Sequence, residues 1–125
     1  MSTWSDVREL CRDLPDTVEE PDRAWRVHGK LFVFERPLRR ADVAHLGDAV
    51  PDDVPMGAWT PDLEAKAALL ASEPDAFFTT PHFDGYALVL ARLDRVAPDV
   101  LREVVMDAWL ARAPRRLGAR WLAEH

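Results

Sequence analysis

The fold is decided by residues 77–114, which read FFTTPHFDGYALVLARLDRVAPDVLREVVMDAWLARAP. Residues 87–93 are mostly aliphatic and predict a strand, and the turn residues Asp84 and Gly85 precede it. Pro98 then opens a long helix, because a first helical turn has no use for the N–H that proline lacks. The apolar residues of this helix recur at helical spacing and predict its buried side: Leu101, Val104, Val105, Ala108 and Trp109.

The first 36 residues predict a helix and a hairpin. Ser5 can cap a helix that Pro15 stops. Its apolar stripe consists of Val7, Leu10, Cys11 and Leu14. The acidic residues 16–22 read as a turn. Residues 24–36 alternate in polarity around a turn at Gly29 and predict a β-hairpin.

Shorter elements connect these parts. They are a helix over 39–46, a loop over 49–55, a strand over 56–59, a helix from Pro61-Asp62 and final helical turns over 115–122. The helix after Pro61 has an apolar stripe of Leu63, Ala67 and Leu70. Hairpins and non-alternating helices predict an α+β fold, in which helices cover mainly one face of an antiparallel sheet. We expect one domain over residues 1–125.

Bulk properties narrow the class of protein. The chain has 125 residues, nearly half of them apolar, and one cysteine, Cys11. An internal disulfide is therefore impossible, and we expect a bacterial, cytoplasmic protein without a membrane span. Cys11 lies on an apolar stripe, which predicts a buried, inert thiol. The net charge of −6 argues against a protein that coats nucleic acid through overall charge.

Few side chains are spaced for chemistry. His82 and Asp84 are two residues apart and could form an acid–base or ligand pair, but Asp84-Gly85 is more typical of a turn. The other histidines are scattered, so we expect no metal site and no cofactor. Two tryptophans, Trp59 and Trp121, could be stacking platforms or interface anchors.

Two groups of arginines are candidates for binding phosphate. One group is Arg36, Arg39 and Arg40, and the other is Arg112, Arg115 and Arg116. Arginine contacts phosphate in a bidentate way, and several arginines on one surface sum to useful affinity. The alternative is a solvated helix face that pairs with the acidic first half. A nucleic-acid surface requires the two groups to meet in space.

The quoted stretch resembles the MmcQ/YjbR family, through residues 77–86, a strand ending at Arg92-Leu93-Asp94, and the run Ala113-Pro114-Arg115-Arg116-Leu117. The likeness covers about residues 60–122, whereas the segment 37–53 is longer than in short members. The resemblance implies a CyaY-like α+β fold. It also implies DNA binding, since two hairpin wings of the family were proposed to embrace a duplex. It supplies no catalytic residue.

These observations give two hypotheses about function. The first is a non-enzymatic binding module that holds DNA weakly through the two arginine groups. The second is a domain that binds a small ligand or a protein partner, in a pocket near Thr80, His82, Asp84, Tyr86 and Trp109. An enzyme is the third reading, and it would need His82 in a cleft with an oriented partner.

Overall fold

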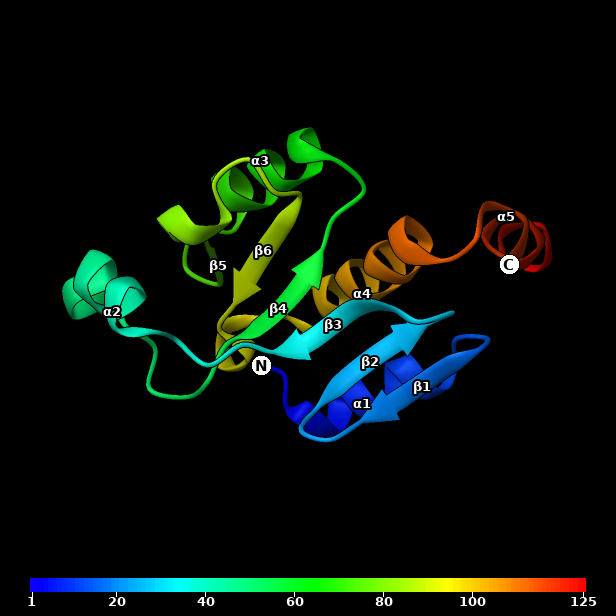
Figure 1. Ribbon diagram of the computed structural model, residues 1–125, viewed down its shortest axis with the longest axis horizontal. Coiled ribbons are helices and arrows are strands. Elements are labelled where there is room, and N and C mark those ends of the chain that lie inside the picture. Colours follow the sequence, from blue (N-terminus) through cyan, green and yellow to red (C-terminus); the bar gives the residue numbers. More distant parts are fainter.

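A six-stranded antiparallel sheet organises residues 1–125, all of which are described by the computed structural model (Figure 1). The strand order is β1-β2-β3-β4-β6-β5, so the hairpin strands lie at one side and the strands of the quoted stretch at the other. The strands are β1 (Thr17–Glu20), β2 (Ala24–Val27), β3 (Lys30–Glu35), β4 (Met56–Trp59), β5 (Phe77–Phe78) and β6 (Leu88–Ala91). This α+β architecture is the one that the sequence predicts.

Five α-helices accompany the sheet: α1 (Trp4–Arg12), α2 (Arg40–Leu46), α3 (Leu63–Ser72), α4 (Pro98–Arg112) and α5 (Arg115–Glu124). Single 3-10 turns occur at η1 (Gly47–Ala49), η2 (Pro81–Phe83) and η3 (Leu93–Arg95). Helix α1 begins earlier than predicted because Thr3 and Asp6 form a reciprocal capping box, with N···O distances of 3.2 and 2.9 Å.

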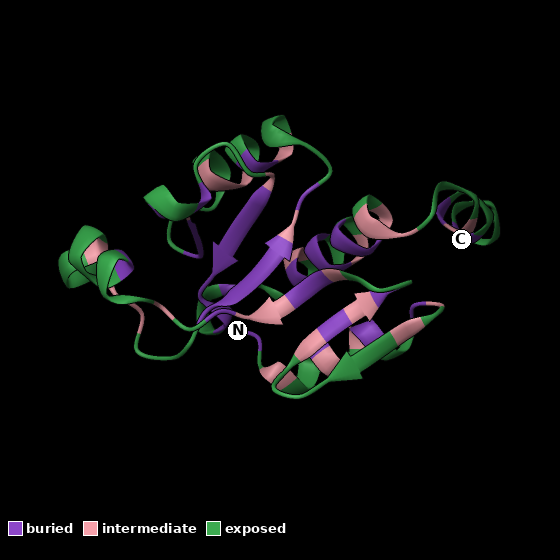
Figure 2. Ribbon diagram, in the orientation of Figure 1, coloured by how far each residue is buried: buried purple, intermediate pink, exposed green.

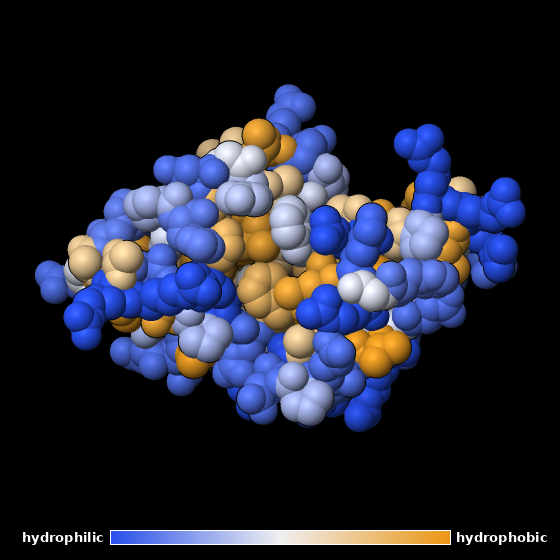
Figure 3. All heavy atoms as spheres, in the orientation of Figure 1, coloured by the Kyte–Doolittle hydropathy of each residue, from blue (hydrophilic) through white to orange (hydrophobic).

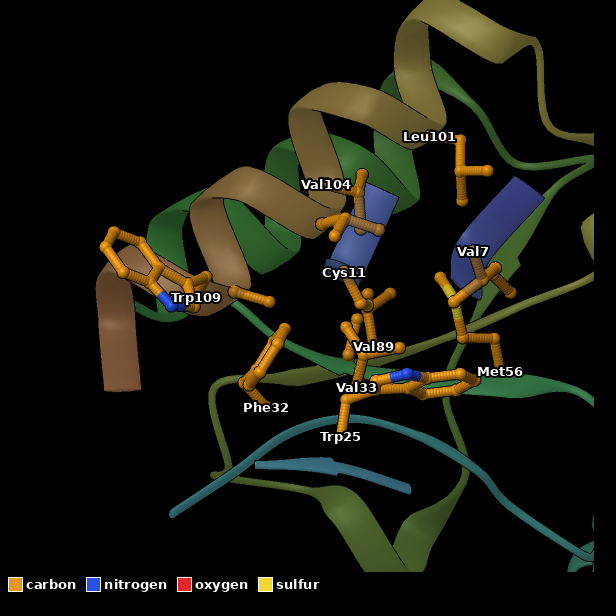
Figure 4. Close-up of a cluster of buried hydrophobic side chains, with 14 of the residues drawn as sticks. Val7, Cys11, Trp25, Phe32, Val33, Met56, Val89, Leu101, Val104 and Trp109 are labelled. Atoms are coloured by element: carbon orange, nitrogen blue, oxygen red, sulfur yellow. The ribbon is translucent and has the colours of Figure 1, made fainter. Parts of the chain in front are cut away.

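The main core lies between the sheet and the pair α1 and α4 (Figures 2 and 4). It contains 21 buried residues, which include Cys11 of α1 and Trp25, Val33 and Met56 of the strands. All five residues predicted for the inner side of α4 are buried, so that prediction is confirmed. The predicted burial of Cys11 is confirmed as well, and burial strongly raises the pKa of its thiol.

Two local predictions were wrong. Residues 17–20 form the edge strand β1 paired with β2, and not part of an acidic turn, because tertiary pairing outweighs the poor β-propensity of Glu19 and Glu20. In α3, Leu63 and Ala67 are exposed, while Leu69 and Leu70 pack against the core and Lys66 is buried. The helix is therefore rotated relative to the predicted stripe.

The opposite side of the sheet, which we call the open face, lacks a covering helix pair. It carries the strand residues whose side chains point away from α1 and α4, among them Leu31, Phe34, Gly57, Trp59 and Leu90. Leu38 and Leu46 pack over one end of it. Towards β2 and β3 the face is only half-buried, and Figure 3 shows apolar atoms gathered in its middle between hydrophilic surroundings.

Candidate binding face

Three arginines stack on aromatic rings along the open face. The Cζ atom of Arg112 lies 4.3 Å from the centre of the Trp59 ring. The other two stacks are Arg92 on Phe78 at 4.4 Å and Arg36 on Phe83 at 5.1 Å. A guanidinium over a ring face is attracted by the ring quadrupole, and the stack fixes the plane of the guanidinium.

Backbone carbonyls, rather than carboxylates, are the main acceptors of these arginines. Arg112 Nε donates to Leu31 O at 3.2 Å, and Arg92 Nη2 donates to Ala49 O. Neither arginine forms an ion pair. Arg112 is half-exposed, so most of the five N–H donors of its guanidinium stay available to an anion, whereas Arg92 is buried. The positive charge of these two side chains is therefore not neutralised by a contacting acid.

Arg36 is the exception, because it belongs to a buried polar cluster with Asp42 and Thr80. Its Nη1 donates to Pro37 O at 2.8 Å, and its Nη2 lies 3.5 Å from the Asp42 carboxylate. Asp42 also accepts from Arg39 N at 2.9 Å. Burial alone would raise the pKa of Asp42, but the Arg39 N–H and the charge of Arg36 outweigh it and lower that pKa. The Thr80 hydroxyl is buried near this carboxylate and also helps to lower its pKa, although it forms no hydrogen bond of ordinary geometry.

Lys66 stabilises the turn formed by residues 83–86. Its Nζ is buried and donates to Phe83 O at 2.8 Å and to Tyr86 O at 2.9 Å. Burial lowers the pKa of this ammonium group, and no carboxylate contacts it. Lys66 therefore ties α3 to residues 83–86, which precede strand β6.

The two predicted arginine groups do not converge. Helix α2 and helix α5 lie at opposite ends of the long axis of the molecule (Figure 1), so the expected common patch is absent. Arg39 and Arg40 at the start of α2, and Arg115 and Arg116 at the start of α5, are all exposed and form no ion pair. The exposed arginines therefore lie at the two ends of the molecule, beyond the strands of the sheet.

The predicted pocket does not form as a unit. Trp109 is fully buried in the main core, where its Nε1 donates to Pro15 O at 3.1 Å, so its place in a surface pocket was wrong. Thr80 is buried, His82 and Asp84 are exposed, and Tyr86 is 56% exposed. His82 meets Phe83 edge-on, with ring centres 4.8 Å apart. Asp84-Gly85 forms the predicted turn, with Gly85 at a φ of 82°.

A cavity of about 470 Å³ opens beside Arg92, at the end of the sheet near the N-terminus. Arg23 contributes a second cation to it, while Glu35, Asp53 and Asp94 contribute acids. Because these charges have both signs, the cavity has no clear preference for an anion. No three His, Cys, Asp or Glu side chains are close enough together to hold a metal ion.

Sequence reasoning missed the roles of Asp42, Lys66 and Arg92. Asp42 and Lys66 lie outside any predicted apolar stripe, and no signal in one sequence marks a buried charge that tertiary contacts satisfy. Arg92 lies on the same side of its strand as Leu88 and Leu90, as the alternation of residues indicates.

Comparisons with known proteins agree with this architecture. The model of the YjbR family matches residues 12–111. The chain belongs to the YjbR family. Uncharacterised YjbR relatives from Mycobacterium tuberculosis and Mycobacterium bovis are 42% identical over 126 aligned residues, which cover 98% of this chain and 98% of each relative.

A solved structure supports the fold of this YjbR protein. The crystal structure of the Deinococcus radiodurans protein DR2400, with a DUF419 domain, superposes with a TM-score of 0.65. The alignment covers 88% of this chain and 78% of that one, at 21% identity, so it bears on the fold alone. As for membranes, none of the helices combines the length and apolar character that crossing one requires.

Proposed function

We propose that this YjbR protein is a non-enzymatic binding module that holds a nucleic-acid strand on the open face, between α2 and α5. The observation that carries the proposal is the half-exposed, ring-stacked guanidinium of Arg112, whose hydrogen-bond acceptor is a carbonyl and not a carboxylate. A phosphate can replace solvent on such a guanidinium without first breaking an ion pair.

The exposed arginines at the two ends add the long-range attraction. Arg39 and Arg40 lie at one end, and Arg115 and Arg116 at the other, and none of them is paired with an acid. An acidic net charge weakens this attraction at a distance, but screening within about 10 Å at moderate salt leaves local charges in control of contact. Binding is therefore expected to be weak and strongly dependent on salt.

Fluorescence anisotropy with a labelled oligonucleotide at low salt tests the proposal. Affinity should fall as salt rises, and the double variant Arg115→Ala/Arg116→Ala should reduce the slope of log K against log salt by about two, roughly one per lost phosphate contact. The matched control is Arg12→Ala/Arg102→Ala, because these arginines are equally exposed and lie on the helices that cover the other face. Absence of binding at low salt would exclude the proposal.

A protein partner with an acidic segment is the second candidate for the same face. The half-buried Leu31 and Phe34 favour it, since apolar side chains at the centre of a surface are typical of protein interfaces. Adding polyglutamate to the titration separates the two candidates. Competition by polyglutamate at the same charge concentration as the oligonucleotide would indicate an acidic protein partner.

A further inference from the structure

We infer that the open face selects single-stranded over double-stranded nucleic acid, with the Arg112–Trp59 stack as its base-stacking platform. This inference rests on the proposed function and specifies its ligand. It goes beyond charge, because phosphates are common to both forms of nucleic acid, whereas free base faces are offered only by a single strand.

The platform is half-exposed, and its two residues come from different elements. Trp59 ends β4 and Arg112 ends α4, so the stack joins the sheet to a helix that also packs on β3 and β4. The hydrogen bond from Arg112 Nε to Leu31 O, at 3.2 Å, fixes the guanidinium in its plane. A base can extend this stack, because both aromatic rings and guanidinium planes accept a base face.

Next to the platform, the face offers a second flat surface. Phe34 lies so close over Gly57 that a Cβ atom there would stand 2.6 Å from the ring. The ring is therefore pressed against β4 instead of projecting from it. Phe34 and Trp59 are both half-buried and come from paired strands, so successive bases of one strand can meet them in turn.

A duplex cannot use these surfaces. Its bases are stacked on one another, and their edges are reached only by side chains that enter a groove. Phe34, Trp59 and Arg112 are half-buried in the face and do not project in this way. A duplex could therefore touch only the exposed arginines at the two ends, which gives binding through phosphate contacts alone.

The test compares three labelled ligands by anisotropy in the same low-salt buffer: an oligothymidylate of about 12 nucleotides, a duplex of equal length, and an abasic strand with the same phosphates. The oligothymidylate is expected to bind about 10-fold more tightly than the abasic strand, which corresponds to one or two stacked bases. Trp59→Ala should remove most of this difference, while Trp59→Phe should keep much of it. Arg112→Lys keeps the charge but loses the plane, and should resemble Trp59→Ala.

The outcomes separate this inference from the proposed function. Equal or tighter binding of the duplex, or equal binding of the abasic strand, would overturn single-strand selectivity and leave nucleic-acid binding standing. No binding of any of the three ligands would overturn both. The circular dichroism spectrum of Trp59→Ala must first match that of the native protein. If this variant does not fold, the Trp59→Phe and Arg112→Lys variants still test the inference.

Discussion

The two faces of the same sheet are built in different ways. The face under α1 and α4 belongs to a core of 21 buried residues, and its large members include Trp25 and Trp109. The open face has a cluster of only four buried residues, and its rings are covered by guanidinium groups instead of a helix. The first face stabilises the fold by excluding water, whereas the second keeps charge close to apolar surface.

This difference indicates which face of the sheet is the better candidate for a binding site. Replacing ring-covering arginines by leucines would bury the open face at less electrostatic cost, since burial lowers the pKa of both Arg36 and Arg92. A sheet that served stability alone would not need these charges. The arrangement agrees with the proposed binding role of the open face, and measurements that compare the two faces can test that proposal.

The largest expected difference is between Trp109 of α4, in the main core, and Trp59 of β4, on the open face. Trp109→Ala should lower the free energy of unfolding by about 3–5 kcal/mol, because it leaves a cavity in a packed core. Trp59→Ala should cost only about 1 kcal/mol, because Trp59 is half-exposed and its stacking partner is an arginine. Urea unfolding followed by circular dichroism measures both. Equal losses would contradict the assignment of the open face to binding.

A smaller but pH-dependent effect is expected at Asp42. Asp42→Asn leaves Arg36 buried without a carboxylate and should cost about 3 kcal/mol at neutral pH. Because the pKa of Asp42 is lowered in the folded state, its contribution is complete above the ordinary pKa of about 3.9 and is lost as the pH falls towards the lower folded value. The variant and the native protein should therefore approach each other in stability at acidic pH.

The control for this pair is Asp16, whose carboxylate lies 2.8 Å from Nε2 of His28 on an exposed edge. Asp16→Asn should cost well under 1 kcal/mol, as exposed ion pairs do. Urea midpoints over a range of pH values, measured for both variants, decide the matter. A difference between Asp42→Asn and the native protein that stays constant down to strongly acidic pH would argue against the buried ion pair.

The next effect compares two glycines. Gly57→Ala should destabilise the protein by about 1–3 kcal/mol, because the new Cβ would overlap the Phe34 ring. Gly118→Ala in α5 meets only a Leu110 methyl group at 3.5 Å, so it should be neutral or gain up to about 1 kcal/mol from helix propensity. Thermal unfolding temperatures of the two variants measure the difference in their stability. A harmless Gly57→Ala would mean that Phe34 moves freely on the open face.

Much of this architecture could be predicted from the sequence where a pattern is local and long. The spacing of apolar residues over 98–112 placed every inner residue of α4, and the aliphatic run over 87–93 predicted β6. Strand β1 was missed because its four residues, TVEE, carry no alternation and gain their structure only by pairing with β2.

The candidate site was predictable only in its parts. The six arginines and Trp59 stood out as residue types suited to phosphate and stacking, but no sequence signal tells that Arg112, at the end of α4, meets Trp59 at the end of β4. Nor could sequence show that α2 and α5, at whose starts the exposed arginines lie, are at opposite ends of the molecule. Such contacts join residues far apart in the chain, and one sequence carries no record of them.

The smallest expected effect on stability is local and concerns the only two lysines. Lys66→Met removes two hydrogen bonds to the carbonyls of Phe83 and Tyr86, but it also removes the cost of burying an ammonium group, whose pKa is lowered by that burial. These terms oppose each other, so the net loss should be about 1 kcal/mol. Lys30→Met, at an exposed position, should change almost nothing.

Amide hydrogen exchange gives the sharper readout for this pair. Residues 83–86 should exchange faster in Lys66→Met than in the native protein, while the main core around Val33 keeps its protection, because the lysine holds one turn and not the whole sheet. Lys30→Met should leave both regions unchanged. Faster exchange throughout the sheet would instead show that the turn of residues 83–86 also stabilises the main core. The two faces of the sheet would then not be energetically independent.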